Sequence, residues 1–404
     1  MVTRLEERGV EKADRILDSN IKQYIKEMNN KKKMFCTVAL AALTLSGHAQ
    51  ESKQWFSNVK LSGYALTQYQ YSSQANNKSN SFNLRMLRAS LEGRILDDFY
   101  WKTQIQFNGN TSTLGSSPRV VDLFVEWQKY DFARIKVGQF KRAFTFENPM
   151  NPIDQGFMSY GQNVLKLAGF NDRNGDHASN GRDIGVQLQG DLLKNSNDRY
   201  LFHYQVGVYN GQGINVKDVD QQKDVIGGVW FMPIKGMRLG WFGWTGSFAR
   251  KGTWQTLDAN GNAVDHSGIR KLQQRRYAFS AEYKANDWTV RSEYIHSTGY
   301  AFKKTYQDVD DAKDCKLSSD GNKAEGVYAL VIAPLLKKKL YAKARYDYYS
   351  NTGSGADARI AYEAGLNYLF GKNIQINAEY AHITDRTLQK ENYNMVDVEL
   401  DFRF

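Results

Sequence analysis

Apolar and polar residues alternate along most of the chain from residue 59 to residue 404. The clearest segment is 99–108, in which Phe99, Trp101 and Ile105 alternate with polar side chains. A period of two predicts a strand with one apolar and one polar face. Arg85 falls out of phase, which predicts a β-bulge near Met86. Sixteen strands are predicted, at 59–71, 82–95, 99–108, 120–129, 133–140, 182–190, 200–209, 224–232, 237–249, 273–284, 287–297, 325–334, 339–349, 358–369, 373–382 and 394–404.

The connections between these strands alternate in length. Links such as KYDF, PIKG and FGKN are short, whereas the others are long and polar, including 250–272 and 297–324. Most strands are near the 9–11 residues that a tilted strand needs to cross a bilayer. Outer-membrane barrels have this arrangement, with turns in the periplasm and loops outside. The predicted fold class is therefore all-β, a 16-stranded antiparallel transmembrane β-barrel.

Soluble all-β folds also contain many short strands. The links of a β-sandwich need not alternate in length, and a propeller requires a repeat of constant period that this chain lacks. The last strand favours the barrel, because Val398, Leu400, Phe402 and Phe404 share one face. A final aromatic residue on the apolar face is what outer-membrane assembly machinery typically reads.

The composition agrees with the barrel only when the alternation is considered. A mean hydropathy of −0.60 and 24% charged residues are typical of a soluble globular protein. Transmembrane barrels have such values because only every second residue faces lipid. The 13% of aromatic residues and the 5 prolines fit membrane interfaces and uninterrupted sheet ladders.

The N-terminal region has the features of a signal peptide. Three lysines precede the apolar segment MFCTVALAALTL, which is too short to span a bilayer as a helix, and the small-x-small site Gly47-His48-Ala49 follows. Cys315 would then be the single cysteine of the mature chain, so no internal disulfide is expected. We expect export to the outer membrane of a Gram-negative bacterium and these segments: an upstream extension at 1–27 with translation starting at Met28, a signal peptide at 28–49, a periplasmic lead at 50–58 and a barrel at 59–404.

The segment 141–181 has no sustained period, although strands are predicted on both sides of it. Loops of about forty residues are uncommon in compact domains unless they have a function. Between two barrel strands, this length predicts a constriction loop that folds into the lumen. Its basic residues are the candidate anion-constriction site: Lys141, Arg142, Lys166 and Arg173.

The lumen wall carries a second set of charges. Sixteen strands enclose an aqueous lumen, so inward-facing residues decide which solutes pass. Fixed cations at the narrowest point favour anions, because no point of a narrow pore lies far beyond the Debye length of ~8 Å. The alternative, that these cations pair with lumen carboxylates and stiffen the wall, stays open. Strand phase places ten basic residues inside, namely Arg88, Arg94, Lys102, Arg134, Lys136, Arg238, Arg276, Arg291, Lys343 and Arg345, together with the carboxylates Asp122, Glu126, Glu282, Glu293, Asp347 and Glu363.

Signals for catalysis or metal binding are weak. His203 has no nucleophile and base converging on it, so no catalytic site is expected. Asp172, Asn174 and Asp176 have the opening spacing of a calcium loop, but His177 occupies the position that requires glycine. We therefore expect neither metal nor cofactor. The net charge of +11 indicates anionic partners in general, and nucleic acid is not expected for an exported protein.

Three stretches resemble the phosphate-selective porin O and P family. They are RIKVGQFKRAFTFE at the predicted loop entry, VYNGQGIN followed by KDVIGG, and LRMLRASLEGRILDDFYWKTQIQF near the start of the barrel. The resemblance implies a sixteen-stranded trimeric porin whose third external loop folds inward. It implies that Lys141 is the lysine of the eyelet and that wall arginines form a ladder leading to it.

Pattern and resemblance together predict a porin for passive, anion-preferring diffusion of small solutes such as phosphate and chloride. The barrel would contact membrane lipid and lipopolysaccharide and form a homotrimer. Two alternatives stay open. One is a non-selective general diffusion porin, and the other is an adhesin or receptor that acts through the loops at 250–272 and 297–324.

Overall fold

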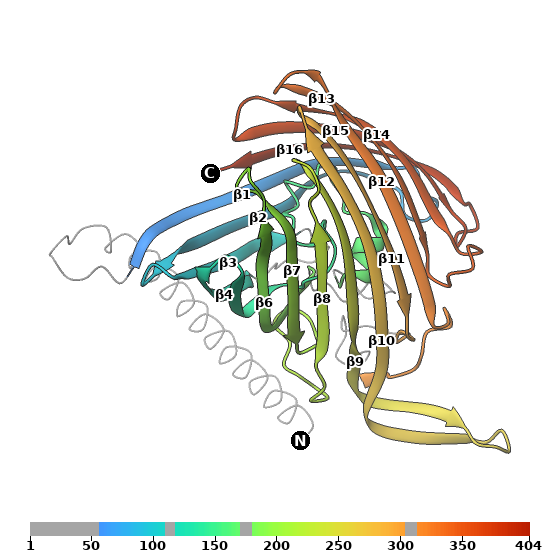
Figure 1. The fold of residues 1–404 in the computed structure, drawn as a ribbon. Helices are drawn as coiled ribbons and strands as arrows, with labels where there is room; N and C mark the ends of the chain where they lie inside the picture. Colours follow the sequence, from blue (N-terminus) through green and yellow to red (C-terminus); the bar gives the residue numbers. More distant parts are fainter. Residues whose placement is uncertain (1–55, 110–117, 170–179, 304–312) are drawn as a thin grey trace, which may run out of the picture. The chain divides into compact units, whose positions relative to one another are not determined.

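A computed structural model describes residues 56–109, 118–169, 180–303 and 313–404 (Figure 1). They form a closed barrel of sixteen antiparallel strands, in which sequence neighbours pair and β1 closes onto β16. This confirms the predicted fold class. The strands are β1 (Phe56–Ser72), β2 (Ser79–Ile95), β3 (Phe99–Gly109), β4 (Arg119–Tyr130), β5 (Ala133–Lys141), β6 (Arg182–Lys194), β7 (Tyr200–Tyr209), β8 (Asp224–Phe231), β9 (Met237–Leu257), β10 (Ala263–Ala285), β11 (Trp288–Thr298), β12 (Lys323–Leu336), β13 (Leu340–Ser350), β14 (Arg359–Leu369), β15 (Ile374–Asp385) and β16 (Asn392–Arg403).

The outer face of the barrel is apolar. Val137, Val186, Val208 and Val225 lie directly opposite one another on β5 to β8, and all four are exposed. Such a row on consecutive strands fits contact with lipid tails, and the β-branched side chains suit the pleated surface.

The last strand has the predicted phase. Leu400 and Phe402 are 42% and 40% exposed, whereas Glu399 and Asp401 are 2% and 1% exposed. The carboxylates therefore face inward and the apolar residues face outward. A slip of one residue would reverse both sets, so the contrast fixes the register of this strand.

The predicted alternation of connections is present. Short turns occupy one end of the barrel, at 96–98, 131–132, 195–199, 232–236, 286–287, 337–339 and 370–373. The longer connections lie at the other end and include the one between β5 and β6. Among the described residues, no helix has the length and apolar character needed to cross a membrane.

The connection expected at 250–272 is in fact a β-hairpin. β9 and β10 stay paired as far as Leu257 and Ala263, past the ends of β8 and β11, and the hairpin projects beyond its neighbours (Figure 1). The Asp258 side chain closes the turn by accepting hydrogen bonds from the amides of Asn260 and Asn262. The prediction was wrong because it ended each strand where the alternation of apolar and polar residues ends, whereas the pairing of β9 with β10 continues beyond that point.

The N-terminal segments expected at 1–27 and 28–49 lie outside the described residues. Of the lead expected at 50–58, residues 56–58 belong to β1. The loop expected at 297–324 is described except for 304–312. It follows the end of β11 at Thr298 and precedes the start of β12 at Lys323.

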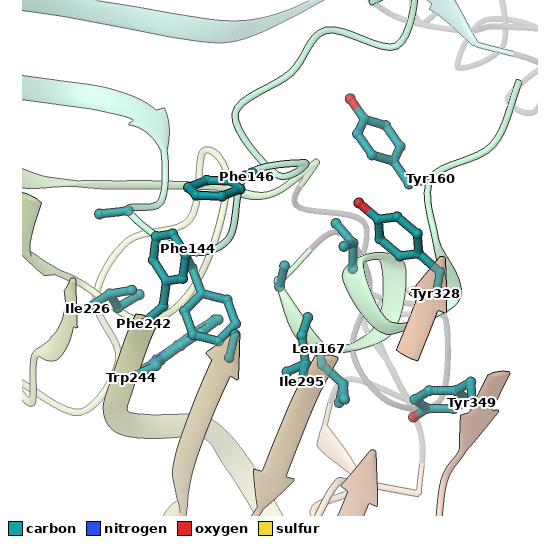
Figure 2. Close-up of a cluster of buried hydrophobic side chains, with 14 of the residues drawn as sticks. Phe144, Phe146, Tyr160, Leu167, Ile226, Phe242, Trp244, Ile295, Tyr328 and Tyr349 are labelled. Carbon is teal, nitrogen blue, oxygen red and sulfur yellow. The ribbon is translucent and has the colours of Figure 1, made fainter. Parts of the chain in front are cut away.

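The connection between β5 and β6 folds into the lumen, and the barrel core forms around it. Its first part packs Phe144 and Phe146 against Phe242 and Trp244 of β9 (Figure 2). Gly240 makes this close packing feasible, since a Cβ there would lie 2.8 Å from ring atoms of both Phe146 and Phe242. The connection also contains a helix that the sequence analysis missed, α2 (Gln162–Leu167).

Candidate functional site

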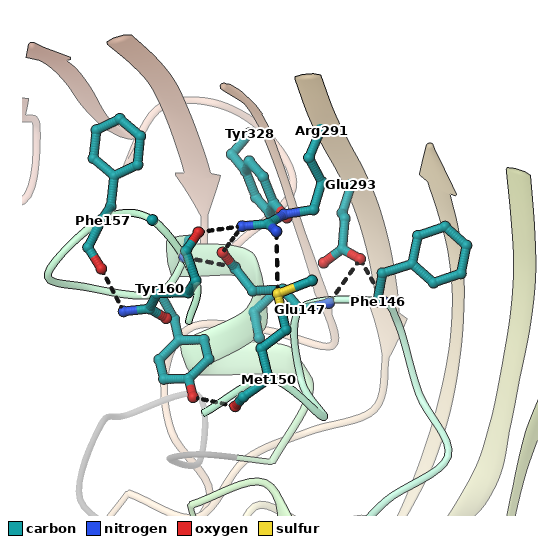
Figure 3. A network of polar contacts seen from close by, with 12 residues as sticks. Phe146, Glu147, Met150, Phe157, Tyr160, Arg291, Glu293 and Tyr328 are labelled. Carbon is teal, nitrogen blue, oxygen red and sulfur yellow. Dashed lines mark hydrogen bonds and ion pairs between the residues drawn. The ribbon is translucent and has the colours of Figure 1, made fainter. Parts of the chain in front are cut away.

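The described part of the inward connection, residues 142–169 and 180–181 and hereafter the inward loop, is attached to the wall through its backbone. Its first attachment is on β11, where the Glu293 carboxylate accepts hydrogen bonds from the amides of Phe146 and Glu147, at 2.5 and 3.1 Å (Figure 3). The neighbouring Arg291 donates to the Glu147 carboxylate at 3.2 Å and to the Gln155 carbonyl at 2.6 Å. On this one strand, Glu293 thus binds backbone N–H groups of the inward loop, and Arg291 binds a backbone carbonyl and a carboxylate of the loop.

The same arrangement recurs on β13 and β15. Asp347 accepts from the amide of Gln162 at 3.0 Å, and Glu379 accepts from the amide of Met158 at 2.9 Å. Lys343 donates to the Gly156 carbonyl at 3.0 Å and to Glu379 at 2.5 Å. A loop inside a barrel has few strand partners for its backbone, and these charged side chains satisfy groups that burial would otherwise leave unpaired.

Charges on this side of the lumen are largely neutralised. Arg291 lies between Glu147 and Glu282, and Arg345 pairs with Glu363 and donates to the Ser159 carbonyl. Arg291 and Arg345 are buried, as are Glu147 and Gln155, which Arg291 contacts. Removing one partner from such a group leaves a buried charge without compensation, which is costly. We call this set, Glu147, Arg291, Glu293, Lys343, Arg345, Asp347 and Glu379, the loop clamp.

On the opposite wall, a few cations near the start of the inward loop have little carboxylate charge beside them. Arg88 of β2 donates to Gln106 and to the Tyr64 hydroxyl, and within the described part of the chain it makes no ion pair. Arg119 of β4 is half-buried, and its side chain has no hydrogen bond or ion pair with any described residue. Arg182 of β6 pairs with Asp122 at 2.6 Å. The three guanidinium groups are close enough to interact electrostatically.

Lys141 joins this group to the inward loop. Its ammonium group donates to the carbonyls of Asn148, at 2.8 Å, and Met150, and to the Tyr160 hydroxyl at 3.3 Å. It also interacts electrostatically with Arg88 and Arg182. We call Arg88, Arg119, Lys141 and Arg182 the cationic cluster. Asp122 is the carboxylate that pairs with a member of it.

The fold and the charged lumen can be compared with known proteins. The model of the Gram-negative porin family matches residues 36–388. The chain belongs to the Gram-negative porin family. A comparison of the sequence with curated proteins finds no match.

Solved structures of outer-membrane proteins share the fold. Salmonella typhi OmpF in complex with daunomycin has a TM-score of 0.58 at 12% identity, covering 86% of this chain and 97% of that chain. The outer-membrane channel DcaP of Acinetobacter baumannii has a TM-score of 0.57 at 11% identity, covering 88% of this chain and 99% of that chain. A loop-deletion mutant of Vibrio cholerae OmpT has a TM-score of 0.56 at 12% identity, covering 86% of this chain and 99% of that chain. Family and fold make this protein an outer-membrane diffusion channel.

The other predicted constriction residues of the porin lie in different surroundings. Arg142 is buried, pairs with Asp183 at 2.7 Å and lies over the Trp244 ring. Lys166 is in the last turn of α2, and Arg173 lies outside the described residues. Of the predicted constriction residues, Lys141 is the one that the structure brings into the cationic cluster.

The remaining six predicted wall residues of the porin all have partners among the described residues. Arg94 donates to the Asp97 carbonyl and to Gln128, and Arg276 donates to Ser297 and to the Leu167 carbonyl of α2. The others form ion pairs: Lys102 with Glu92 at 3.6 Å, Arg134 with Asp191 at 2.6 Å, Lys136 with Glu126 at 3.7 Å and Arg238 with Glu282 at 2.8 Å. These contacts are of the kind expected if the cations pair with lumen carboxylates and stiffen the wall.

Sequence reasoning missed three lumen arginines of the porin, Arg85, Arg119 and Arg182. Arg85 is the unpaired residue of a bulge between Leu84 and Met86, which confirms the predicted bulge. It donates to Glu399 at 2.7 Å. The sequence showed that Arg85 is out of phase, but the prediction did not extend to the direction of its side chain, which the bulge changes.

Arg119 was missed because a second bulge changes the phase of β4. Gln104 pairs with Asp122 and the next residue of β3 pairs with Val120, so Val121 has no partner. A bulge inserts one residue and reverses the faces of those beyond it. Uninterrupted alternation puts Arg119 outside, and no residue in this stretch marks the bulge.

Proposed function

We propose that this porin prefers anions and that the cationic cluster produces the preference. The observation that carries the proposal is the charge balance where the inward loop meets β2 to β6. Among the residues that the structure describes, Arg88, Arg119, Lys141 and Arg182 are the cations there, and Asp122 is the carboxylate that pairs with one of them. The carboxylates Glu147 and Asp154 of the inward loop are already paired with Arg291 and Arg403.

Small anions such as chloride and phosphate are the proposed solutes. Arginine suits oxyanions because its planar group donates two parallel hydrogen bonds, and Arg119 has its donors uncommitted among the described residues. Each close charge changes the energy of a passing ion by about 1 kcal/mol or more, depending on hydration. A few such charges are enough to distinguish chloride from potassium.

The assembly is proposed to be a homotrimer in contact with lipid and lipopolysaccharide. One of the solved structures with this fold, Vibrio cholerae OmpT, is described as a trimer form. The exposed apolar outer face supports a membrane environment for each barrel. Chemical cross-linking of the porin in native outer membranes tests the trimer. The proposal predicts a product of three chains, and a product of one chain alone would contradict it.

The test of selectivity is the zero-current potential of the purified porin in a planar bilayer across a KCl gradient. Anion preference predicts a potential with the sign of chloride. Adding phosphate at constant ionic strength is expected to reduce the chloride current, because phosphate binds the same guanidinium groups.

A potential near zero would contradict the proposal and make the protein a general diffusion porin. A chloride-signed potential without any effect of phosphate would support anion preference and exclude phosphate recognition. The two measurements therefore separate charge selectivity from oxyanion binding.

A further inference from the structure

A hollow of about 520 Å³ lies at the end of the barrel that carries the short turns. It is bordered by the turns at 337–339 and 370–373, by the end of β16 and by Ile153 of the inward loop. In porins this end faces the periplasm. The volume falls within the range of ~300–1,000 Å³ that is usual for small-molecule sites.

The lining of this hollow is basic. Lys338, Lys372 and Arg403 all contribute to it. Among the described residues, the ammonium groups of Lys338 and Lys372 have no hydrogen bond or ion pair. Arg403 pairs with Asp154 at 2.7 Å. The hollow therefore has two ammonium groups and a guanidinium group on its lining, and Ile153 and Ile374 give it an apolar side.

We infer that this hollow, the periplasmic pocket, binds the phosphate group of a small water-soluble organic phosphate. Lysine and arginine are the usual protein ligands of phosphate oxygens. The volume exceeds what a bare phosphate ion fills, and the apolar side provides contact for an organic body. The inference is independent of the anion preference proposed above, because none of the cationic cluster lines this pocket.

The pocket is connected to the inward loop. Gln375 and Arg403 line it and both donate to the carbonyl of Ile153, at 3.4 and 3.3 Å. A phosphate group that recruits Arg403 competes with Asp154 and with this carbonyl for the same donors. Binding therefore weakens two contacts that hold the inward loop, and it is expected to change the conductance from the periplasmic side.

The experiment is calorimetric titration of the purified full-length porin with glucose 6-phosphate, with glucose and inorganic phosphate as separate probes. Saturable heat is expected for glucose 6-phosphate and not for glucose. Replacing both turn lysines, Lys338→Ala with Lys372→Ala, is expected to weaken binding about tenfold or more, because two charge-assisted hydrogen bonds are lost. Lys390→Ala, an exposed lysine of the external connection 386–391, is the control and is expected to leave binding unchanged.

A second variant guards against a loss caused by misfolding. Asp154→Asn removes the carboxylate that competes for Arg403, so it is expected to tighten binding of glucose 6-phosphate severalfold. In a planar bilayer, glucose 6-phosphate added on one side alone is expected to alter the current. Lack of saturable heat, or equal affinity in the double lysine variant, contradicts the site.

Two further outcomes identify other sources of the same chemistry and also contradict the inference. One is binding of inorganic phosphate as tight as that of glucose 6-phosphate, which gives the organic body no role. The other is that glucose 6-phosphate does not bind while a response appears only in bilayers that contain phosphatidylglycerol, which assigns the pocket to a lipid headgroup.

Discussion

The two sides of the lumen use the same kinds of side chain for different purposes. On β11 to β15, the basic residues of the loop clamp are buried, paired with carboxylates and bonded to carbonyls of the inward loop. On β2 to β6, the cationic cluster contains Arg88 and Arg119, which make no ion pair with described residues. The first set holds a structure, and the second leaves positive charge for solutes.

The difference shows that the partner, rather than the residue type, decides the role of a lumen cation. Arg291 and Arg88 are both 1% exposed. Arg291 is surrounded by Glu147 and Glu282, whereas Arg88 contacts neutral oxygens of Gln106 and Tyr64. A buried ion pair cancels its own field at a distance, but a cation bonded to neutral groups keeps its field.

Breaking the loop clamp should give the largest effect. Arg291→Met leaves the carboxylates of Glu147 and Glu282 without this partner, and breaking a buried pair costs roughly 3–5 kcal/mol. We expect a lower urea midpoint for unfolding in detergent micelles and faster proteolysis within 142–181. Lys390→Met is the control, and an unchanged midpoint in Arg291→Met would show that the clamp does not hold the inward loop.

Removing Asp122, the carboxylate paired with the cationic cluster, should increase the preference for anions. Asp122→Asn leaves Arg182 without its ion-pair partner and adds one net positive charge. We expect the anion-to-cation permeability ratio to rise about fivefold, which corresponds to about 1 kcal/mol for one close charge. Zero-current potentials measure the ratio. Glu391→Gln, an exposed acid of the external connection, is the matched control, and a fall in the ratio for Asp122→Asn would contradict the assignment.

Salt should weaken the contribution of the cationic cluster. The Debye length falls from ~10 Å at 0.1 M to ~3 Å at 1 M, so fixed charges act over a shorter distance. We expect the permeability ratio of the wild-type porin to approach one as the mean KCl concentration is raised over this range. A ratio independent of salt would indicate exclusion by size or by contact instead of by the field.

The smallest effect is expected from the hairpin of β9 and β10. Replacing residues 254–268 by a short glycine-serine turn removes a segment that lies past the ends of β8 and β11. Conductance and selectivity should stay as in the wild type, because none of the residues replaced belongs to the loop clamp or the cationic cluster. A changed single-channel conductance would place this hairpin over the passage.

The sequence predicts the barrel well because lipid imposes one simple rule on every strand. Apolar residues such as Val137 and Val186 must face outward, and this requirement gives strand number, order and phase. The hairpin beyond Ala249 does not follow this rule, because it extends past the ends of β8 and β11. The helix α2 escapes it because the inward loop takes its shape from contacts with β11 to β13.

The candidate site was predictable only in part. The inward loop, Lys141 and Arg88 follow from loop length and strand phase. Arg119 does not, because an unpaired Val121 reverses the phase at the end of β4. The division into a loop clamp and a cationic cluster depends on contacts of the inward loop with distant strands, such as Glu293 with Phe146, which no local pattern encodes.

The most direct test of the account is the zero-current potential of Arg119→Glu beside that of Lys390→Glu, in the same KCl gradient. Both variants change the charge by the same amount, but Arg119 lies in the cationic cluster and Lys390 lies on an external connection. Arg119→Glu is expected to lower the anion-to-cation permeability ratio about 25-fold, which is about fivefold for each of the two charges changed, while Lys390→Glu leaves the ratio unchanged. Equal potentials for the two variants would contradict the claim that the cationic cluster sets the selectivity.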